Sequence, residues 1–348
     1  MQHILASSPR AREALDLVSS LQQRFAELLE DIAADLGMHQ SFSPVRWQRD
    51  EGRHGGGMRL ETADGPMIGR GSINVSQVHY DDEPARRLGS ATAISTIIHP
   101  FHPLAPSIHI HISWTEMKQQ NGYWRIMADL NPAIPEASDA ASFEQALRQA
   151  APAHFHQARQ QGDRYFFIPA LGRHRGIVHF YLEQFNSGDF DADHELAARV
   201  GKAAVDTYGQ ILRQRLKHIQ PPSKEQMRAQ LDYHTLYFFQ VLTLDRGTTS
   251  GLLVHDQNDL GIMGSLPARV DRALLQSWVP RMCSPQDELL QALINALPNE
   301  SPCTVDAACK KRLADTVRRH YQQHPEAISM QATADVVPPT VINHMPEG

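Results

Sequence analysis

The sequence predicts an α+β fold in which an antiparallel β-sheet is covered by helices, and three observations support this prediction. Residues 107–114 alternate between apolar and polar side chains, which is the period of a strand that buries one face. Apolar residues recur at helical spacing from Leu17 to Leu36, as in a helix that covers a core. Strand-like and helix-like segments do not alternate regularly along the chain, so a doubly wound parallel sheet is disfavoured.

The regular elements follow from local signals taken in the order of the chain. Ser8 and Pro9 supply a helix cap and a proline in the first turn, and Gly37 can end this first helix. The three prolines between residues 100 and 106 cannot donate to a sheet, so they mark a turn between two strands. The expected strands are 67–80, 93–99, 107–114 and 122–132, and the further helices are 138–150, 193–217, 284–297 and 306–320.

Other segments give less regular patterns. Residues 164–185 and 236–254 are rich in aromatic and β-branched side chains around turn-like residues, and both predict hairpins. Residues 47–61 combine glycines with arginines and are expected to form a flexible basic loop, which is either a solvated turn or a loop that closes over an anion. We expect residues 1–322 to form a single domain and residues 323–348 to form a disordered tail.

Composition limits the classes of function. The net charge of −6 gives no reason to expect a nucleic-acid or anionic-membrane partner. No apolar run approaches twenty residues, so no membrane span is expected, and the N-terminus lacks the apolar core of a signal peptide, which favours a cytoplasmic location. The cysteines are three and late in the chain, which indicates reduced thiols with a structural role: Cys283, Cys303 and Cys309.

Histidine is the unusual residue type. The chain has 19 histidines, and the polar side of the strand 107–114 carries His109 and His111 between two serines. This composition is typical of a cavity wall, although a half-buried strand with hydrogen-bonded histidines is the plainer interpretation. His99 and His102, just upstream, favour a site for metal binding or proton transfer. Asp129 ends the strand 122–132, where it either lines a pocket or caps a turn.

Several fragments occur in the order that characterises one family, and together they cover residues 44–298. They are WQRDEGRHGGGMR, RGSINVSQVH, ATAISTIIHPFHPLAPSIHIHIS, YWRIMADLNP, DRYFFIPALGRHRGI and LDRGTTSGLL. The chain thereby resembles the oxygen-dependent coproporphyrinogen III oxidases. The resemblance implies a large, flat antiparallel sheet sandwiched between helices, usually in a homodimer. It also implies oxidative decarboxylation of two propionates of coproporphyrinogen III to vinyl groups in haem biosynthesis, with molecular oxygen as co-substrate and no organic cofactor. A divalent metal has been proposed for the family.

The resemblance also assigns roles to residues. His109 matches the family's proton donor, Asp129 the carboxylate beneath the pyrrole nitrogens, and Arg175 the arginine of an RGI element. Ser95 matches the family's substrate-site serine, and His99 matches its histidine before proline. Asp245 and Arg246 match a DRG turn, and Arg246 is expected to contact substrate.

Other positions depart from the family pattern. His111 replaces an asparagine, and Ser113 replaces an arginine that helps to hold a propionate, a role that serine fills poorly. Both are expected to face the substrate. Residues 125–128 replace a glycine run, residues 255–258 replace a glycine- and arginine-containing loop, and Glu144 and Ala170 replace two histidines. A set of four residues then offers imidazole and carboxylate ligands for iron or manganese: His99, His109, His111 and Glu144.

Three functions remain open from the sequence. The first is the family reaction on coproporphyrinogen III. The second is a metal-dependent oxygenase or decarboxylase that acts on another carboxylate, which the loss of arginine at Ser113 favours. The third is a non-catalytic tetrapyrrole-binding protein, which the retained His109 and Asp129 argue against.

Overall fold

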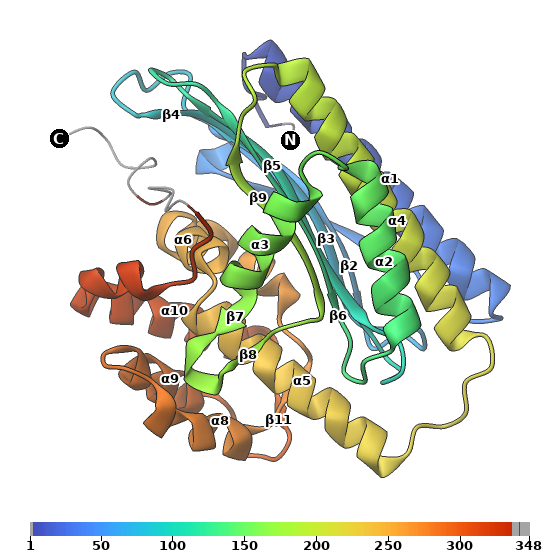
Figure 1. The fold of residues 1–348 in the computed structure, drawn as a ribbon. Helices are drawn as coiled ribbons and strands as arrows, with labels where there is room; N and C mark the ends of the chain where they lie inside the picture. The colour runs from blue at the N-terminus through green and yellow to red at the C-terminus, as the bar shows by residue number, and fades with distance from the viewer. Residues whose placement is uncertain (1–2, 336–340, 342–348) are drawn as a thin grey trace.

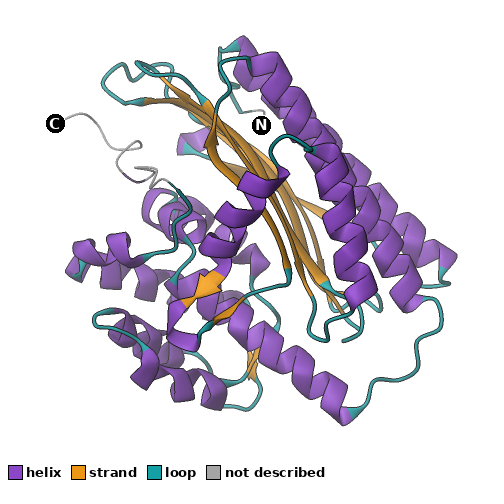
Figure 2. Ribbon diagram, in the orientation of Figure 1, coloured by secondary structure: helices purple, strands orange, loops and turns teal. Residues whose placement is uncertain are grey.

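The chain is built around a seven-stranded sheet with the strand order β1-β2-β3-β4-β5-β6-β9, in which every neighbouring pair is antiparallel (Figures 1 and 2). The computed structural model describes residues 3–335 and 341, without the side chain of Asp256. The strands of this sheet are β1 (Ser43–Gln48), β2 (Gly55–Ala63), β3 (Ile68–His79), β4 (Leu88–Pro100), β5 (Ser107–Met117), β6 (Tyr123–Asn131) and β9 (Val178–Phe185). Two-residue ribbons pair β7 (Phe167–Ile168) with β8 (Arg173–His174) and β10 (Arg269–Val270) with β11 (Cys303–Thr304).

Helices cover both faces of the sheet, as Figure 1 shows. One face is packed by α1 (Pro9–Asp35), α2 (Ala137–Ala150) and α4 (Phe190–Leu216), while α3 (Phe155–Phe166) lies along β9. The other face lies under α5 (Lys224–Thr243), α6 (Arg246–Val254), α7 (Asp259–Ile262), α8 (Arg272–Trp278), α9 (Gln286–Ala296) and α10 (Ala307–Gln323). The predicted α+β fold, with an antiparallel sheet between helical layers, is therefore confirmed.

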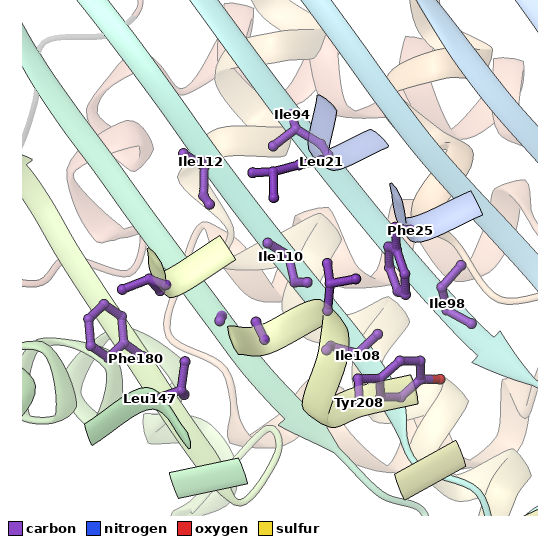
Figure 3. Packing of buried hydrophobic residues seen from close by; sticks show 14 of the residues in the cluster. Leu21, Phe25, Ile94, Ile98, Ile108, Ile110, Ile112, Leu147, Phe180 and Tyr208 are labelled. Atoms are coloured by element: carbon purple, nitrogen blue, oxygen red, sulfur yellow. The ribbon is translucent and has the colours of Figure 1, made fainter. Parts of the chain in front are cut away.

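The alternation predicted for β5 decides which side chains enter which layer. Ile108, Ile110 and Ile112 are buried in the core under α1 and α4, beside Phe25 and Tyr208 (Figure 3). A side chain alternates between the two faces with each residue, so the intervening polar residues of β5 point to the opposite face. That face carries the candidate site.

The expected flexible loop at residues 47–61 is wrong for most of its length: the last two residues of β1 and residues 55–61 of β2 lie in this range, and only residues 49–54 form a turn between them. The glycines serve close packing rather than flexibility. A Cβ atom on Gly57 would lie 2.3 Å from the carbonyl oxygen of Val75 and 2.7 Å from Nε1 of Trp47. The strand therefore requires glycine at this position, where the backbone of β3 and the indole of Trp47 approach it.

The hairpin expected at 236–254 is also wrong, since α5 and α6 occupy this range. Residues 235–243 of α5 are buried around the whole helix, so no apolar stripe reveals the helical period. Ser223 begins α5 with a capping box, and Asp245 caps α6 through the backbone N–H of Thr248.

Only the second strand of the hairpin expected at residues 164–185 is correct. β9 forms as expected, but it pairs with β6, whereas residues up to Phe166 belong to α3.

The C-terminal segment differs in part from the expected disordered tail. Residues Pro325–Met330 form a 3₁₀ helix, and Ala327, Gln331 and Ala334 are buried. Gln331 donates hydrogen bonds to Thr249 and Tyr321, so residues 325–335 are attached to the helical layer. Residues 336–340 and 342–348 of the expected tail lie outside the described residues. The single domain over residues 1–322 stays a prediction. In the described part of the chain, no helix has both the length and the apolar character needed to cross a membrane.

Candidate active site

The polar side of β5 forms one wall of a cavity between the sheet and the helices α5 to α7. His109, His111 and Ser113 line this cavity of about 280 Å³, as does Ser95 on β4, which lies opposite His111. The cavity is closed from the other side by residues of α5, α6 and the segment after α6, including Tyr237, Thr248 and Gly261. The prediction that this strand face is a cavity wall is confirmed.

The centre of the site is a buried cluster around Asp129 on β6. His109 lies directly opposite Asp129 in the β5–β6 register, and its Nδ1 atom donates to Oδ1 of Asp129 over 2.7 Å. Arg175, which follows β8, donates from Nη2 to Oδ2 of Asp129 over 2.7 Å and from Nη1 to Gln240 over 2.7 Å. Asn131 donates to Oδ2 of Asp129 over 2.5 Å. The structure therefore brings together the three residues predicted to be catalytic.

Electrostatics keep this carboxylate ionised. Burial alone would raise the pKa of Asp129, but Arg175 and then His109 hold that pKa well below its usual range. The guanidinium of Arg175 also lies over the rings of Phe166 and Tyr237, at 4.4 Å and 4.8 Å from their centroids. Asp129 is therefore a fixed negative charge that orients the imidazole of His109.

The geometry separates the roles of His109 and Asp129. Asp129 is 0% exposed, whereas the side chain of His109 is 15% exposed and lines the cavity. With Nδ1 bound to Asp129, the free nitrogen of His109 is Nε2, which makes no hydrogen bond to the described residues. His109 can thus exchange a proton with a ligand, while Asp129 positions it from behind.

Next to this pair, His111 and Ser113 form a neutral polar surface. Nε2 of His111 lies 3.1 Å from Oγ of Ser113. Burial, followed by Arg125 and His109, lowers the pKa of His111 to about 3, so the ring is neutral at physiological pH. Ser113 lies directly opposite Arg125 on β6, and Arg125 also lines the cavity. The guanidinium group of Arg125 therefore comes from the strand next to that of Ser113.

Glu183 on β9 is a second buried carboxylate, and it binds several side chains behind the cavity wall. It accepts hydrogen bonds from Tyr181, at 2.6 Å, and from Arg125, at 3.3 Å, and it pairs with Arg246. Arg246 is 2% exposed and does not line the cavity. Arg246 is thus held by Glu183 behind the cavity wall, and its contact with substrate stays a prediction.

The predicted metal set is not assembled. His99 donates from Nε2 to the carbonyl of Ser265 over 3.1 Å and accepts at Nδ1 from Ser107 over 2.9 Å, so both its nitrogens are engaged. Glu144 lies on α2, which packs against α4, and it binds Arg148 and Arg159.

Among the residues that the structure describes, a different set of three groups has the spacing to hold a metal ion: His54, Asp82 and Glu83. The donors proposed from the sequence do not fit a metal ion, because Glu144 belongs to the opposite helical layer and His99 is already satisfied.

Sequence reasoning missed Arg125 and Glu183. Arg125, Met127 and Asp129 alternate on β6 and share the face of Asp129, so the period of two already placed Arg125 in the cavity wall. Glu183 was detectable as an acidic residue inside the apolar strand VHFYLEQF. Tyr237 and Thr248 were not predicted to line the cavity, because their segment was assigned to a hairpin instead of to α5 and α6.

Comparison with known proteins identifies the family of this chain. A profile of the coproporphyrinogen III oxidase family matches residues 13–297. The oxygen-dependent coproporphyrinogen-III oxidase of Rickettsia bellii is 29% identical over 261 residues, which cover 71% of this chain and 91% of that protein. The enzyme of the same name from Rickettsia africae is 28% identical, with 72% and 92% covered. The mitochondrial enzyme of Rattus norvegicus is 27% identical, with 72% and 61% covered. The chain therefore belongs to the coproporphyrinogen III oxidase family.

Proposed function

We propose that this protein is an oxygen-dependent coproporphyrinogen III oxidase that converts propionate side chains of its tetrapyrrole substrate to vinyl groups. The observation that carries the proposal is the cavity-facing His109, held by the buried Asp129–Arg175 ion pair. Such a pair fixes a proton-transfer group at a defined place on the cavity wall.

The overall reaction defines what the site must supply. One propionate, –CH2–CH2–COO⁻, together with O2 and one proton gives –CH=CH2, CO2 and H2O2. Two electrons pass from the side chain to oxygen, and the carbon–carbon bond to the carboxylate breaks. The protein must therefore bind an anionic side chain, handle protons beside it and keep water away from the reacting carbon.

The residues of the cavity suit these tasks. Nε2 of His109 accepts or delivers a proton at the substrate, and Asp129 holds the imidazole in position without reaching the cavity. Arg125, held by Tyr181 and Glu183, provides a cation for a substrate carboxylate. His111 and Ser95 contribute neutral polar contacts on the same wall. The donors suggested for a metal ion do not converge on one point of the cavity.

The first experiment is aerobic incubation of the purified protein with coproporphyrinogen III, followed by oxidation of the products and chromatography with fluorescence detection. We expect harderoporphyrin and protoporphyrin to form in the presence of oxygen and not in its absence. Folded protein that binds coproporphyrin III but leaves coproporphyrinogen III unchanged would overturn the proposed reaction and support a non-catalytic binding protein. The homodimer and the cytoplasmic location stay predictions.

A further inference from the structure

Three cations gather beside the cavity with few counterions. Arg59 on β2 and Arg70 on β3 point to the same side of the sheet as the cavity wall, and Lys310 comes from α10. Arg59 is 4% exposed and Lys310 is 7% exposed. In the described part of the chain, the one ion pair of these three cations is that between Arg59 and Glu61. Burying cations without matching anions is unfavourable, so this group calls for a negatively charged ligand.

Unsatisfied donors point to the same conclusion. Nη1 of Arg59 and Nε of Arg70 are buried and have no hydrogen-bond partner. Buried guanidinium nitrogens normally find an acceptor, and leaving one unpaired carries the cost of its lost hydration. Burial and the nearby Arg70 lower the pKa of Lys310 to about 8, and Arg59 acts in the same direction while Glu61 opposes it. An anion bound among Arg59, Arg70 and Lys310 would supply the negative charge and the hydrogen-bond acceptors that they lack.

The three cations do not line the cavity themselves, but residues next to Arg59 and Arg70 do. Asn74, the register partner of Arg59, and Ser72 both line the cavity. Gly261 lines it as well, and a Cβ atom on Gly261 would lie 2.4 Å from Nη1 of Arg59. The absence of a side chain at Gly261 therefore leaves Arg59 close to the cavity space.

We propose that Arg59, Arg70 and Lys310 form a carboxylate-binding subsite that holds one propionate of the substrate away from His109. This inference rests on the proposed function, because coproporphyrinogen III carries four propionates and only the reacting one needs to approach His109. Lys310 lies beyond residues 13–297, the part of the chain that matches the family. The subsite therefore includes a group from a C-terminal element that the family profile does not cover.

Binding of coproporphyrin III tests the subsite without requiring turnover, because this oxidised porphyrin is not a substrate. The test variants are Arg70→Gln and Lys310→Met, and Arg70→Lys retains the charge. The matched control is Arg53→Gln, because the side chain of Arg53 is 62% exposed and pairs with Asp82. We expect the two neutral variants to weaken binding about tenfold each and to flatten its dependence on salt, since each removes one charge contact of about this strength. Arg70→Lys keeps the positive charge and Arg53→Gln lies outside the subsite, so both should stay within about threefold of the wild type.

Stability and turnover separate this subsite from a purely structural role. Without ligand, Lys310→Met should unfold at the same temperature as the wild type or higher, because it removes an unpaired buried cation. Weaker porphyrin binding without any turnover by the wild type would support the subsite and overturn the proposed reaction. Normal turnover with unchanged KM and unchanged porphyrin binding in both neutral variants would overturn the subsite and leave the reaction standing. A wild-type protein that does not bind coproporphyrin III would overturn both.

Discussion

His109 and Asp129 face each other across β5 and β6, and the 2.7 Å contact between Nδ1 and Oδ1 sets the tautomer of the histidine. The carboxylate lies in the protein interior, whereas the imidazole reaches the cavity. The pair therefore resembles a proton-transfer unit with a buried orienting group more than two independent acid–base residues.

Replacing His109 should abolish most of the activity. His109→Gln keeps a polar side chain on the strand but cannot exchange a proton at Nε2, so we expect kcat to fall about 100-fold or more. The measurement is the rate of vinyl-porphyrin formation, with His156→Gln on the exposed side of α3 as control. Turnover near the wild-type rate would remove His109 from the mechanism.

Replacing Asp129 should affect both rate and stability. Asp129→Asn leaves the buried guanidinium of Arg175 without its counterion, which costs about 3 kcal/mol of unfolding free energy. The amide can also present its N–H group to Nδ1 of His109, which favours the wrong tautomer and slows turnover. Urea unfolding and product chromatography measure the two effects, and an unchanged midpoint would contradict the assigned ion pair.

The stabilising effect of the Asp129 carboxylate should be lost as the pH is lowered. Because the folded-state pKa of Asp129 is depressed, its stabilisation is complete above the unfolded pKa of about 3.9 and is lost as the pH falls toward the folded value. The difference in unfolding free energy between the wild type and Asp129→Asn should therefore shrink below about pH 4. Denaturant titrations from pH 7 to pH 3 test this, and a constant difference would contradict the depressed pKa.

Replacing Ser113 by arginine should lower the free energy of unfolding unless Arg125 is also removed. Ser113→Arg sets two guanidinium groups directly opposite each other on β5 and β6, which should cost about 1 kcal/mol. The double variant Ser113→Arg with Arg125→Ser should recover this loss. A double-mutant cycle of unfolding free energies measures the coupling, and additive effects would show that the two positions do not interact.

Removing divalent metal should leave turnover unchanged. The donors suggested by the sequence do not converge, since Glu144 binds Arg148 and Arg159 and His99 is saturated by hydrogen bonds. We expect the same rate before and after dialysis against EDTA, and Glu144→Gln should stay within about twofold of the wild type because it changes only a partly exposed pair. Loss of activity that added iron or manganese restores would contradict this prediction.

Strand periodicity predicted the part of the site that lies on β5. An uninterrupted alternation fixes which residues share a face, so His109, His111 and Ser113 were correctly placed together. The same rule would have added Arg125, but an arginine in a short apolar strand is not distinctive without knowledge of its neighbour Glu183.

The remaining misplacements have separate causes. Residues 235–243 of α5 are buried on all sides and show no helical periodicity, so the aromatic residues of this segment were assigned to strands. Glu144 was placed in the metal set through family resemblance alone, and only the three-dimensional arrangement shows that α2 covers the other face.

The order of the strands has a consequence for how the site forms during folding. From β1 to β6 each strand pairs with the next one along the chain, so the contacts that align His109 with Asp129 need only a short loop closure. Arg175 and Gln240 join them from segments that lie 46 and 65 residues away from their partners Asp129 and Arg175. The hairpin that holds the histidine and the carboxylate can therefore form early, while the charge that makes burial of the carboxylate favourable arrives with slower, long-range contacts. We therefore expect the cavity wall to lose its water only when α5 docks.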